Sequence, residues 1–213
     1  MKQVKSFRED NGRIRFLSEE EETRLLPHCG PNLKSLVMTA LHTGFRKSEL
    51  LSLRWENVDR RHRLIRVDAG YVKNREVRSV PMNEVLTQTL QDSTLSQPTL
   101  GLVFRMFRNR TGQPYRDPDS AFDTAVRRAG ITDFTFHDLR HTFASRLVMA
   151  GVDLATVKEL MGHKHIAMTL RYAHLAPGHK RAAVEVLSGG AGKSPSNFHN
   201  TRLIEKGDAG AST

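Results

Sequence analysis

The stretch His137-Asp138-Leu139-Arg140-His141 decides how the whole chain is interpreted, because it gathers three basic side chains at the start of a predicted helix. Residues three and four positions apart share one side of a helix, so the two histidines and the arginine should lie together. An apolar stripe beside them is expected to anchor this helix in the core: Leu139, Phe143 and Leu147.

Three further segments carry side chains of a similar chemical kind. Arg46 lies just past a glycine that is expected to end one helix, and it stands at the mouth of the next. Lys73 lies in a segment expected to form short strands around a turn. His163 follows a glycine, and Tyr172 stands nine residues beyond it. Arginines, a lysine, histidines and a tyrosine are what metal-free attack on a phosphodiester needs.

In this order and at this spacing the motifs resemble the catalytic domain of the tyrosine recombinases, the phage-integrase family, from about Phe16 to Leu187. The resemblance implies a mainly α fold with a small antiparallel β-sheet, the DNA breaking-rejoining fold, in which helices pack around a lysine-bearing hairpin. It also implies that one DNA strand is cut through a 3′-phosphotyrosyl intermediate and passed to a new 5′-hydroxyl, with no cofactor. We expect residues 1–16 to be a linker, 17–188 the catalytic domain and 189–213 a disordered tail.

The two arginines and the tyrosine are assigned to the centre of this chemistry. Charge gathers on two nonbridging oxygens in the transition state, and a guanidinium can bond both without losing its proton, so Arg46 and Arg140 are the predicted clamps. Tyr172 is the predicted nucleophile, and its phenol, with an ordinary pKa of about 10, needs its proton removed. The plain alternatives are salt-bridged surface arginines and a core or surface tyrosine.

The lysine and the histidines complete the predicted catalytic set. Lys73 is the candidate general acid that protonates the 5′ leaving oxygen, with a pKa lowered by nearby arginines. By resemblance, His163 bonds a nonbridging oxygen, His137 helps to manage the proton of the tyrosine, and His141 is supporting structure. A solvated hairpin lysine, and a His137 that only makes hydrogen bonds in the first helical turn, are the alternatives.

The composition favours a nucleic acid as partner. Among 213 residues, 33 Lys and Arg stand against 23 Asp and Glu, which leaves a net charge of +10. Each phosphate that such a protein neutralises releases condensed counterions, although a merely basic protein is an alternative. By resemblance the partner is double-stranded DNA, on which the chain would form a tetrameric synapse. Four arginines are predicted to contact DNA: Arg75, Arg78, Arg105 and Arg108.

Several other classes of protein are disfavoured. The single cysteine, Cys29, rules out an internal disulfide and fits a reducing cytosol. No apolar run approaches the roughly 18 residues of a membrane span, and the polar N-terminus lacks the core of a secretory signal. We therefore expect a cytoplasmic protein of a bacterial cell. The segment 137–141 has the histidine spacing of zinc proteases, but Asp138 is a shorter acid than that site requires and a third ligand is missing, so we expect no metal.

Clear start and stop signals divide the chain into elements. Ser18 and the acids after it form a capping box, a helical stripe from Pro31 ends at Gly44, and Thr135 with Asp138 is expected to cap a helix ending at residue 150. The other expected helices cover 47–53, 83–94, 117–129, 154–161, 166–173 and 179–187. Strands are expected near 64–66, 71–73 and 77–80 around a turn at 74–75, and a loop-rich region over 95–115.

Two further functions remain open from the sequence. A type IB topoisomerase uses a similar set of residues but relaxes DNA, and a decayed integrase would bind DNA without cutting it, although the intact set argues against decay. Members of the resembled family usually carry a separate N-terminal core-binding domain. Because this chain begins almost where the catalytic domain begins, we expect a fragment or a truncated remnant.

Overall fold

Helices make up most of what the computed structural model describes, namely residues 14–67, 78–95, 101, 103–104, 107–108, 114–115 and 117–176. All of these fall in the first of two units into which the chain divides, Met1–Ala176. The described α-helices are α1 (Glu19–Leu25), α2 (Pro31–Thr43), α3 (Lys47–Ser52), α4 (Glu84–Leu95), α5 (Asp119–Arg128), α6 (Asp138–Met149), α7 (Leu154–Met161) and α8 (Ala167–Leu170). Short 3-10 helices are η1 (Leu26–His28), η2 (Trp55–Asn57) and η3 (Ala173–Leu175).

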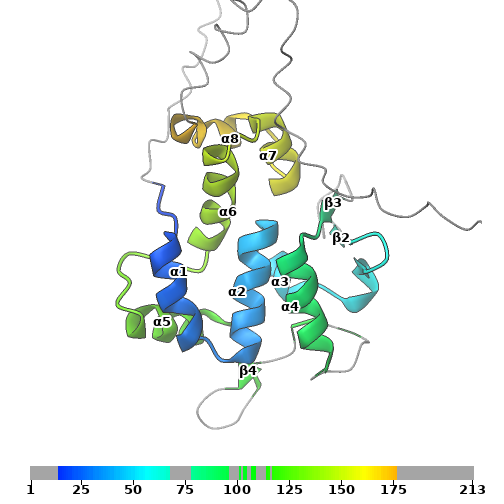
Figure 1. Cartoon of the computed structure of the whole chain (residues 1–213), viewed down its shortest axis with the longest axis vertical. Helices are drawn as coiled ribbons and strands as arrows, with labels where there is room; N and C mark the ends of the chain where they lie inside the picture. Colours follow the sequence, from blue (N-terminus) through cyan, green and yellow to red (C-terminus); the bar gives the residue numbers. More distant parts are fainter. Residues whose placement is uncertain are drawn as a thin grey trace, which may run out of the picture. The chain divides into compact units, whose positions relative to one another are not determined.

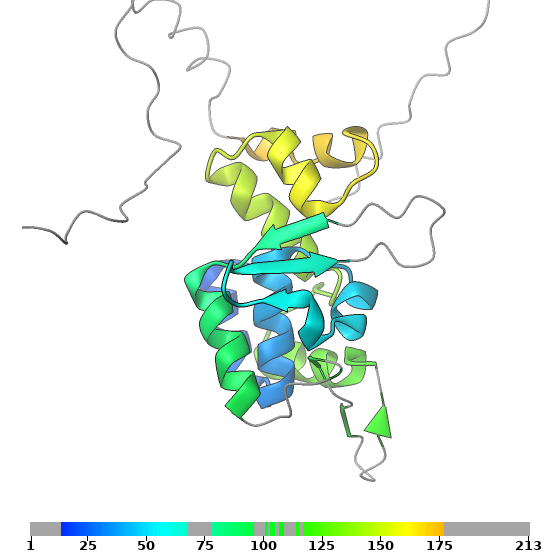
Figure 2. The same ribbon diagram turned by 90° about the vertical axis from the view of Figure 1, so that its right-hand side faces the viewer.

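A small antiparallel sheet accompanies these helices (Figure 2). Its strands are β1 (Val58–Asp59), β2 (Leu64–Val67) and β3 (Arg78–Pro81), in the order β1-β2-β3. Ile65 of β2 pairs with Val80 of β3, and both side chains are buried, as expected when alternate residues of a strand face the core. The predicted fold class, mainly α with a small antiparallel sheet, is confirmed.

Some of the β-structure was not predicted. The strand β1 is one such case, and a second is the pairing of β4 (Phe107–Arg108) with β5 (Pro114–Tyr115). Each of these strands is two residues long, too short to show the alternation of side chains that predicts a strand. The loop-rich region expected over 95–115 therefore contains short strands at these four positions.

Helix α2 forms the centre of the hydrophobic core and contacts both α4 and α6 (Figure 1). Its buried apolar residues recur at helical spacing: Leu33, Leu36, Val37, Ala40 and Leu41. Full burial of a leucine stabilises the fold by about 1.5–3 kcal/mol relative to an exposed one, so this stripe fixes the position of α2. Leu139 of α6 is also fully buried, which anchors the first turn of α6 and with it Arg140.

The predicted start of α1 and the two predicted ends of α2 are confirmed. The hydroxyl of Ser18 accepts the N–H of Glu21 and the Glu21 carboxylate accepts the N–H of Ser18, each at 3.1 Å, which completes the capping box. Gly44 ends α2 with a φ of +64°. A Cβ at Gly44 would stand 2.3 Å from the ring of Phe143, so glycine is needed both for this φ and for the close approach of α6 to α2.

Two helices near the C-terminal end of the described chain differ from the prediction. The Asp138 carboxylate accepts both the N–H and the hydroxyl of Thr135 at 2.7 Å, so this hydroxyl acts as a donor, and α6 begins at Asp138 with His137 as its N-cap residue. The single helix predicted over 166–173 is interrupted. The N–H of Tyr172 bonds the carbonyl of Thr169, three residues back, which separates α8 from η3.

Several predicted features lie outside the residues that the structure describes. Lys73, Arg75, Arg105, the helix over 179–187 and the tail over 189–213 lie outside the described residues. Cys29 is buried, and burial raises the pKa of its thiol to about 11, as suits a structural residue. Within the described part of the chain, no helix is both long and apolar enough to cross a membrane.

Candidate active site

Arg46 lies at the N-cap of α3, two residues after the glycine that ends α2. Its guanidinium donates to Glu49 Oε1 at 3.1 Å and to the carbonyl of Gly162 at 3.3 Å. The N–H of Arg46 bonds Glu49 Oε2 at 2.8 Å, which fixes the backbone at the start of the helix. The side chain is 41% exposed, so this guanidinium is held on one side and open to solvent on the other.

Arg140 lies in the first turn of α6 and is 4% exposed. Its guanidinium donates to the carbonyl of Gly44 and, at 2.6 Å, to the carbonyl of Met161. These carbonyls belong to the C-terminal ends of α2 and α7, where the helix dipole favours a cation. Burial, and then the charge of Arg46, lower the pKa of Arg140 to about 10, so Arg140 stays protonated at neutral pH.

Glu49 joins Arg46 to a third arginine, Arg78 of β3. Arg78 donates to both carboxylate oxygens of Glu49 at 2.8 Å, and the Arg78 side chain is only 16% exposed. Burial alone would raise the pKa of Glu49, but the hydrogen bonds and charge of Arg78, followed by those of Arg46, lower the pKa to about 2. A Cβ at Gly162 would stand 2.6 Å from Arg78 Nη1, so this glycine lets β3 approach the end of α7. We call Arg46, Arg78, Arg140 and Glu49 the arginine cluster.

His163 follows the glycine that ends α7 and is 8% exposed. Its Nδ1 lies 2.9 Å from the hydroxyl of Thr169, which is itself fully buried. Burial, and then the charges of Arg140 and Arg46, lower the pKa of His163 to about 4. At neutral pH the imidazole is therefore uncharged, and Thr169 fixes the orientation of its ring.

Tyr172 lies between α8 and η3 and is 1% exposed. Its ring belongs to a second cluster of buried apolar residues, which we call the tyrosine pocket: Phe143, Ala144, Val148, Val157 and Met161. The hydroxyl lies 2.6 Å from Nδ1 of His141. Burial raises the pKa of Tyr172, with the charges of Arg171 and Arg140 acting in the opposite direction.

His137 packs against the other histidine of α6, His141, which bonds the hydroxyl of Tyr172. The ring centroids of His137 and His141 lie 5.0 Å apart in an edge-to-face arrangement. Burial, and then the charge of Arg140, lower the pKa of His137. The structure therefore places His141, which was predicted to be supporting structure, between His137 and the hydroxyl of Tyr172.

The structure brings together part of the predicted site and adds two contacts. Arg46, Arg140 and His163 meet at the C-terminal end of α7. The hydroxyl of Tyr172 is hydrogen-bonded to His141 and not to any of these three residues. Sequence reasoning missed the role of Glu49, although an acid three residues after an arginine at a helix start is a recognisable signal. It also missed the bond between His141 and Tyr172, because 31 positions separate these residues.

Of the four arginines predicted to contact DNA, the structure describes the side chain of one. Arg78 lies inside the arginine cluster, bound to Glu49. Arg108 lies in β4, where only the backbone is described.

Among the described residues, no group of three or more His, Cys, Asp or Glu side chains could hold a metal ion.

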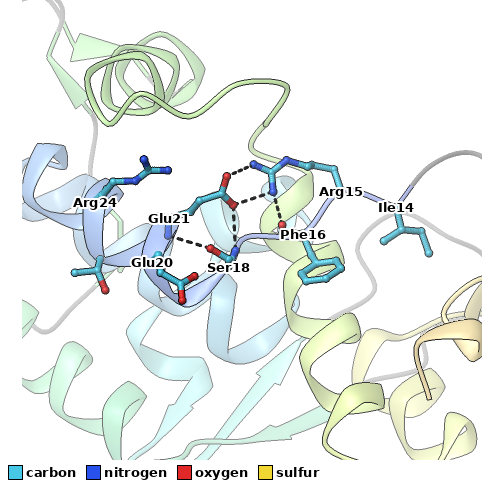
Figure 3. Close-up of a pocket in the computed structure, with 8 residues that line it drawn as sticks. Ile14, Arg15, Phe16, Ser18, Glu20, Glu21 and Arg24 are labelled. Atoms are coloured by element: carbon cyan, nitrogen blue, oxygen red, sulfur yellow. Dashed lines mark hydrogen bonds and ion pairs between the residues drawn. The ribbon is translucent and has the colours of Figure 1, made fainter. Parts of the chain in front are cut away.

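A hollow of about 800 Å³ lies at the start of the described chain (Figure 3). None of the predicted catalytic residues lines it. Its walls are formed by Ile14, Arg15, Phe16, Ser18, Glu20, Glu21, Thr23 and Arg24. Arg15 donates to Glu21 at 2.9 Å, and the same guanidinium stacks over the ring of Phe134 at 5.2 Å. These contacts attach the segment before α1 to the core and offer no pair of groups for catalysis.

Comparison with known proteins identifies the family. Residues 15–179 match the profile of the phage integrase family. The integrase of Salmonella phage P22 is 34% identical over 210 residues, which cover 92% of this chain and 52% of that protein. The integrase of Haemophilus phage HP1 is 33% identical over 189 residues, which cover 85% of this chain and 50% of that protein. The chain belongs to the phage integrase family, and it spans about half the length of the curated relatives it matches.

Solved structures support the same assignment. The catalytic domain of bacteriophage HP1 integrase is 32% identical with a TM-score of 0.61, and the match covers 81% of this chain and 95% of that one. The Tn1549 transposon integrase in complex with circular intermediate DNA is 26% identical with a TM-score of 0.68, and the match covers 84% and 68%. The fold is that of a tyrosine recombinase catalytic domain. These comparisons do not favour a topoisomerase or an inactive remnant.

Proposed function

We propose that this chain is the catalytic domain of a site-specific DNA recombinase, an integrase that cuts and rejoins DNA strands through a 3′-phosphotyrosyl intermediate. The observation that carries the proposal is the meeting of Arg46, Arg140 and His163 at the C-terminal end of α7. Two guanidinium groups beside a neutral imidazole suit the nonbridging oxygens of a phosphodiester.

The two arginines keep donors available for a phosphate. A guanidinium carries five N–H donors. The guanidinium groups of Arg46 and Arg140 each donate two hydrogen bonds within the protein. Arg46 is the more exposed of the two and would meet the phosphate first, with Arg140 behind it. Glu49 is the single carboxylate in the cluster, so three arginines leave an excess of positive charge for the transition state.

The cleavage step uses Tyr172 as nucleophile and Lys73 as general acid. The phenol loses its proton, its oxygen bonds the phosphorus, and the bond from phosphorus to the 5′ oxygen breaks. Lys73 gives a proton to that 5′ oxygen. The phosphotyrosyl bond retains the energy of the broken linkage, so a new 5′-hydroxyl can reverse the step without a cofactor.

The histidines assist two groups in this step, the nonbridging phosphate oxygens and the hydroxyl of the tyrosine. His163, neutral and oriented by Thr169, donates a hydrogen bond to a nonbridging oxygen. His137 helps to manage the proton of Tyr172, and while the tyrosine is buried the ring of His137 packs on that of His141, which bonds the tyrosine hydroxyl. Tyr172 must first leave its buried position to reach a phosphate.

The partner in this proposal is double-stranded DNA, bound by a tetrameric synapse in the bacterial cytoplasm, and no metal takes part. The net charge of +10 supports a polyanionic partner. Arg75, Arg105 and Arg108 are proposed to contact the DNA backbone. Arg78 would reach a phosphate only from within the arginine cluster, since its guanidinium already binds Glu49.

The decisive experiment traps the covalent intermediate. The chain is incubated with suicide DNA substrates, and the protein–DNA adduct is separated on a denaturing gel. Tyr172→Phe should abolish the adduct and leave DNA binding nearly unchanged, because only the nucleophilic oxygen is lost. Tyr115→Phe is the matched control and should retain the adduct. An adduct that persists in Tyr172→Phe would show that another residue attacks.

A further inference from the structure

The tyrosine pocket holds Tyr172 where it cannot attack DNA. A nucleophile must come within roughly 3–3.5 Å of the atom it attacks, with open space along the approach. Tyr172 is 1% exposed, and its ring is enclosed by apolar side chains from α6 and α7, among them Phe143 and Val157. This buried position is therefore one of storage, and the side chain must move before cleavage.

The polar contact that the structure gives to the stored hydroxyl comes from His141, at 2.6 Å. Burial, and then the charge of His137, lower the pKa of His141 to about 4, while burial raises the pKa of Tyr172. At neutral pH the imidazole is therefore uncharged and the phenol keeps its proton. In the His141 tautomer that carries its proton on Nε2, the phenol O–H donates and Nδ1 accepts, a pairing that allows a polar group to stay inside an apolar pocket.

We propose that His141 is a positioning residue that stores Tyr172 in the tyrosine pocket of the DNA-free protein by accepting the hydrogen bond of its hydroxyl. This inference rests on the proposed function, since it takes Tyr172 to be the nucleophile. His141 acts on the position of Tyr172 and does not touch the substrate. It sets how often the tyrosine is available to DNA.

The loss of this acceptor has a measurable consequence. A buried hydroxyl without a partner destabilises the stored position relative to the exposed one, whereas the apolar contacts of the ring are unchanged. The cost of one unpaired buried polar group corresponds to a shift of roughly 5- to 150-fold in that equilibrium. His141→Leu should therefore expose Tyr172 more often by this factor, while His141→Asn should not, because Oδ1 of asparagine can occupy the place of Nδ1.

The experiment measures the reaction of Tyr172 with N-acetylimidazole in the full 213-residue chain without DNA. Peptide mass spectrometry separates Tyr172 from Tyr71 and Tyr115 and gives its rate of acetylation. We expect slow acetylation in the wild type, acetylation roughly 5- to 150-fold faster in His141→Leu, and a rate within about twofold of wild type in His141→Asn. The rescue by asparagine distinguishes a hydrogen bond from general packing.

The matched control is His42→Leu. His42 also uses Nδ1 as an acceptor, from the amide of Asn83 at 2.8 Å, but it lies on α2 outside the tyrosine pocket. Its substitution should lower stability without accelerating the acetylation of Tyr172. Equal rates in His141→Leu and wild type, equal rates in His141→Leu and His141→Asn, or equal acceleration by His42→Leu would each overturn the proposal. Because no DNA is present, these outcomes are independent of whether Tyr172 is the nucleophile.

Discussion

The arginine cluster and the tyrosine pocket differ in how ready each is for catalysis. In the arginine cluster, hydrogen bonds from Arg46 and Arg140 to the backbone of Gly44, Met161 and Gly162 hold the guanidinium groups in place, with one of them open to solvent. In the tyrosine pocket the proposed nucleophile, Tyr172, is enclosed, and burial raises the pKa of its hydroxyl. The groups proposed to stabilise charge are thus assembled in advance, whereas the group proposed to attack is withheld.

This difference has a physical reason. Donors that are fixed before the reaction stabilise a transition state without reorganisation, so early assembly of the arginines is favourable. An exposed nucleophile gains nothing from early assembly, and a phenol is chemically inert while it keeps its proton. Helix α7 contacts both regions, because its C-terminal end accepts hydrogen bonds from both arginines and its buried face packs on Tyr172.

The largest expected effect comes from the arginine cluster. Arg46→Ala and Arg140→Ala should each slow adduct formation by roughly 10²–10³, the loss that follows removal of one preorganised donor. Single-turnover cleavage of a suicide substrate measures this rate, and EDTA should leave it unchanged. Arg54→Ala is the matched control, since Arg54 lies outside the arginine cluster and forms an exposed ion pair with Glu56. Inhibition by EDTA that zinc or magnesium reverses would refute the metal-free mechanism.

A smaller effect is expected when Glu49 loses its charge. The folded pKa of about 2 lies below the ordinary value of 4.5, so the stabilisation by Glu49 is fully present above about pH 4.5 and is lost as the pH falls toward 2. A depression of this size corresponds to about 3 kcal/mol. Urea unfolding of Glu49→Gln should show lower stability at pH 7, and a weaker loss of stability between pH 5 and pH 3 than in wild type.

The control for this measurement is Glu56→Gln, because Glu56 is exposed and its ion pair with Arg54 should contribute little. If wild type and Glu49→Gln lose stability equally on acidification, Glu49 does not hold the cluster together. Glu49→Gln should also slow cleavage, since Arg46 and Arg78 would lose their shared partner, whereas the burial of Tyr172 should stay the same.

The sequence predicts the arginine cluster better than the tyrosine pocket. Helix stops are local signals, so Gly44 and the placement of Arg46 after it could be derived from neighbouring residues. The apolar stripe of α6 likewise predicts that Arg140 is anchored near the core. The hydrogen bond from Tyr172 to His141 depends on how α6, α7 and α8 pack together, and no local pattern encodes that packing.

The errors have similar causes. Thr135 with Asp138 was expected to cap α6, and the two residues do pair, but the threonine hydroxyl donates to the Asp138 carboxylate and the N-cap residue is His137. The predicted helix over 166–173 breaks because Tyr172 bonds the carbonyl three residues back as its ring enters the core. In both places a tertiary or short-range contact outweighs helical propensity.

The smallest expected effect is on the salt dependence of DNA binding, which should respond to a substitution in the arginine cluster but not to one in the tyrosine pocket. The binding constant of the chain for DNA should fall steeply as salt rises, with little preference between specific and scrambled sequences, because phosphate contacts position a protein without specifying a site. Arg46→Ala should reduce the slope of log K against log salt by about 0.9, the value for one phosphate contact. Tyr172→Phe should leave the slope unchanged, since a buried phenol neutralises no phosphate. Titration by fluorescence anisotropy at several salt concentrations measures both slopes. Equal slopes for Arg46→Ala and wild type would show that the exposed side of Arg46 does not meet DNA in the bound state, and that the cluster is less prepared than its geometry indicates.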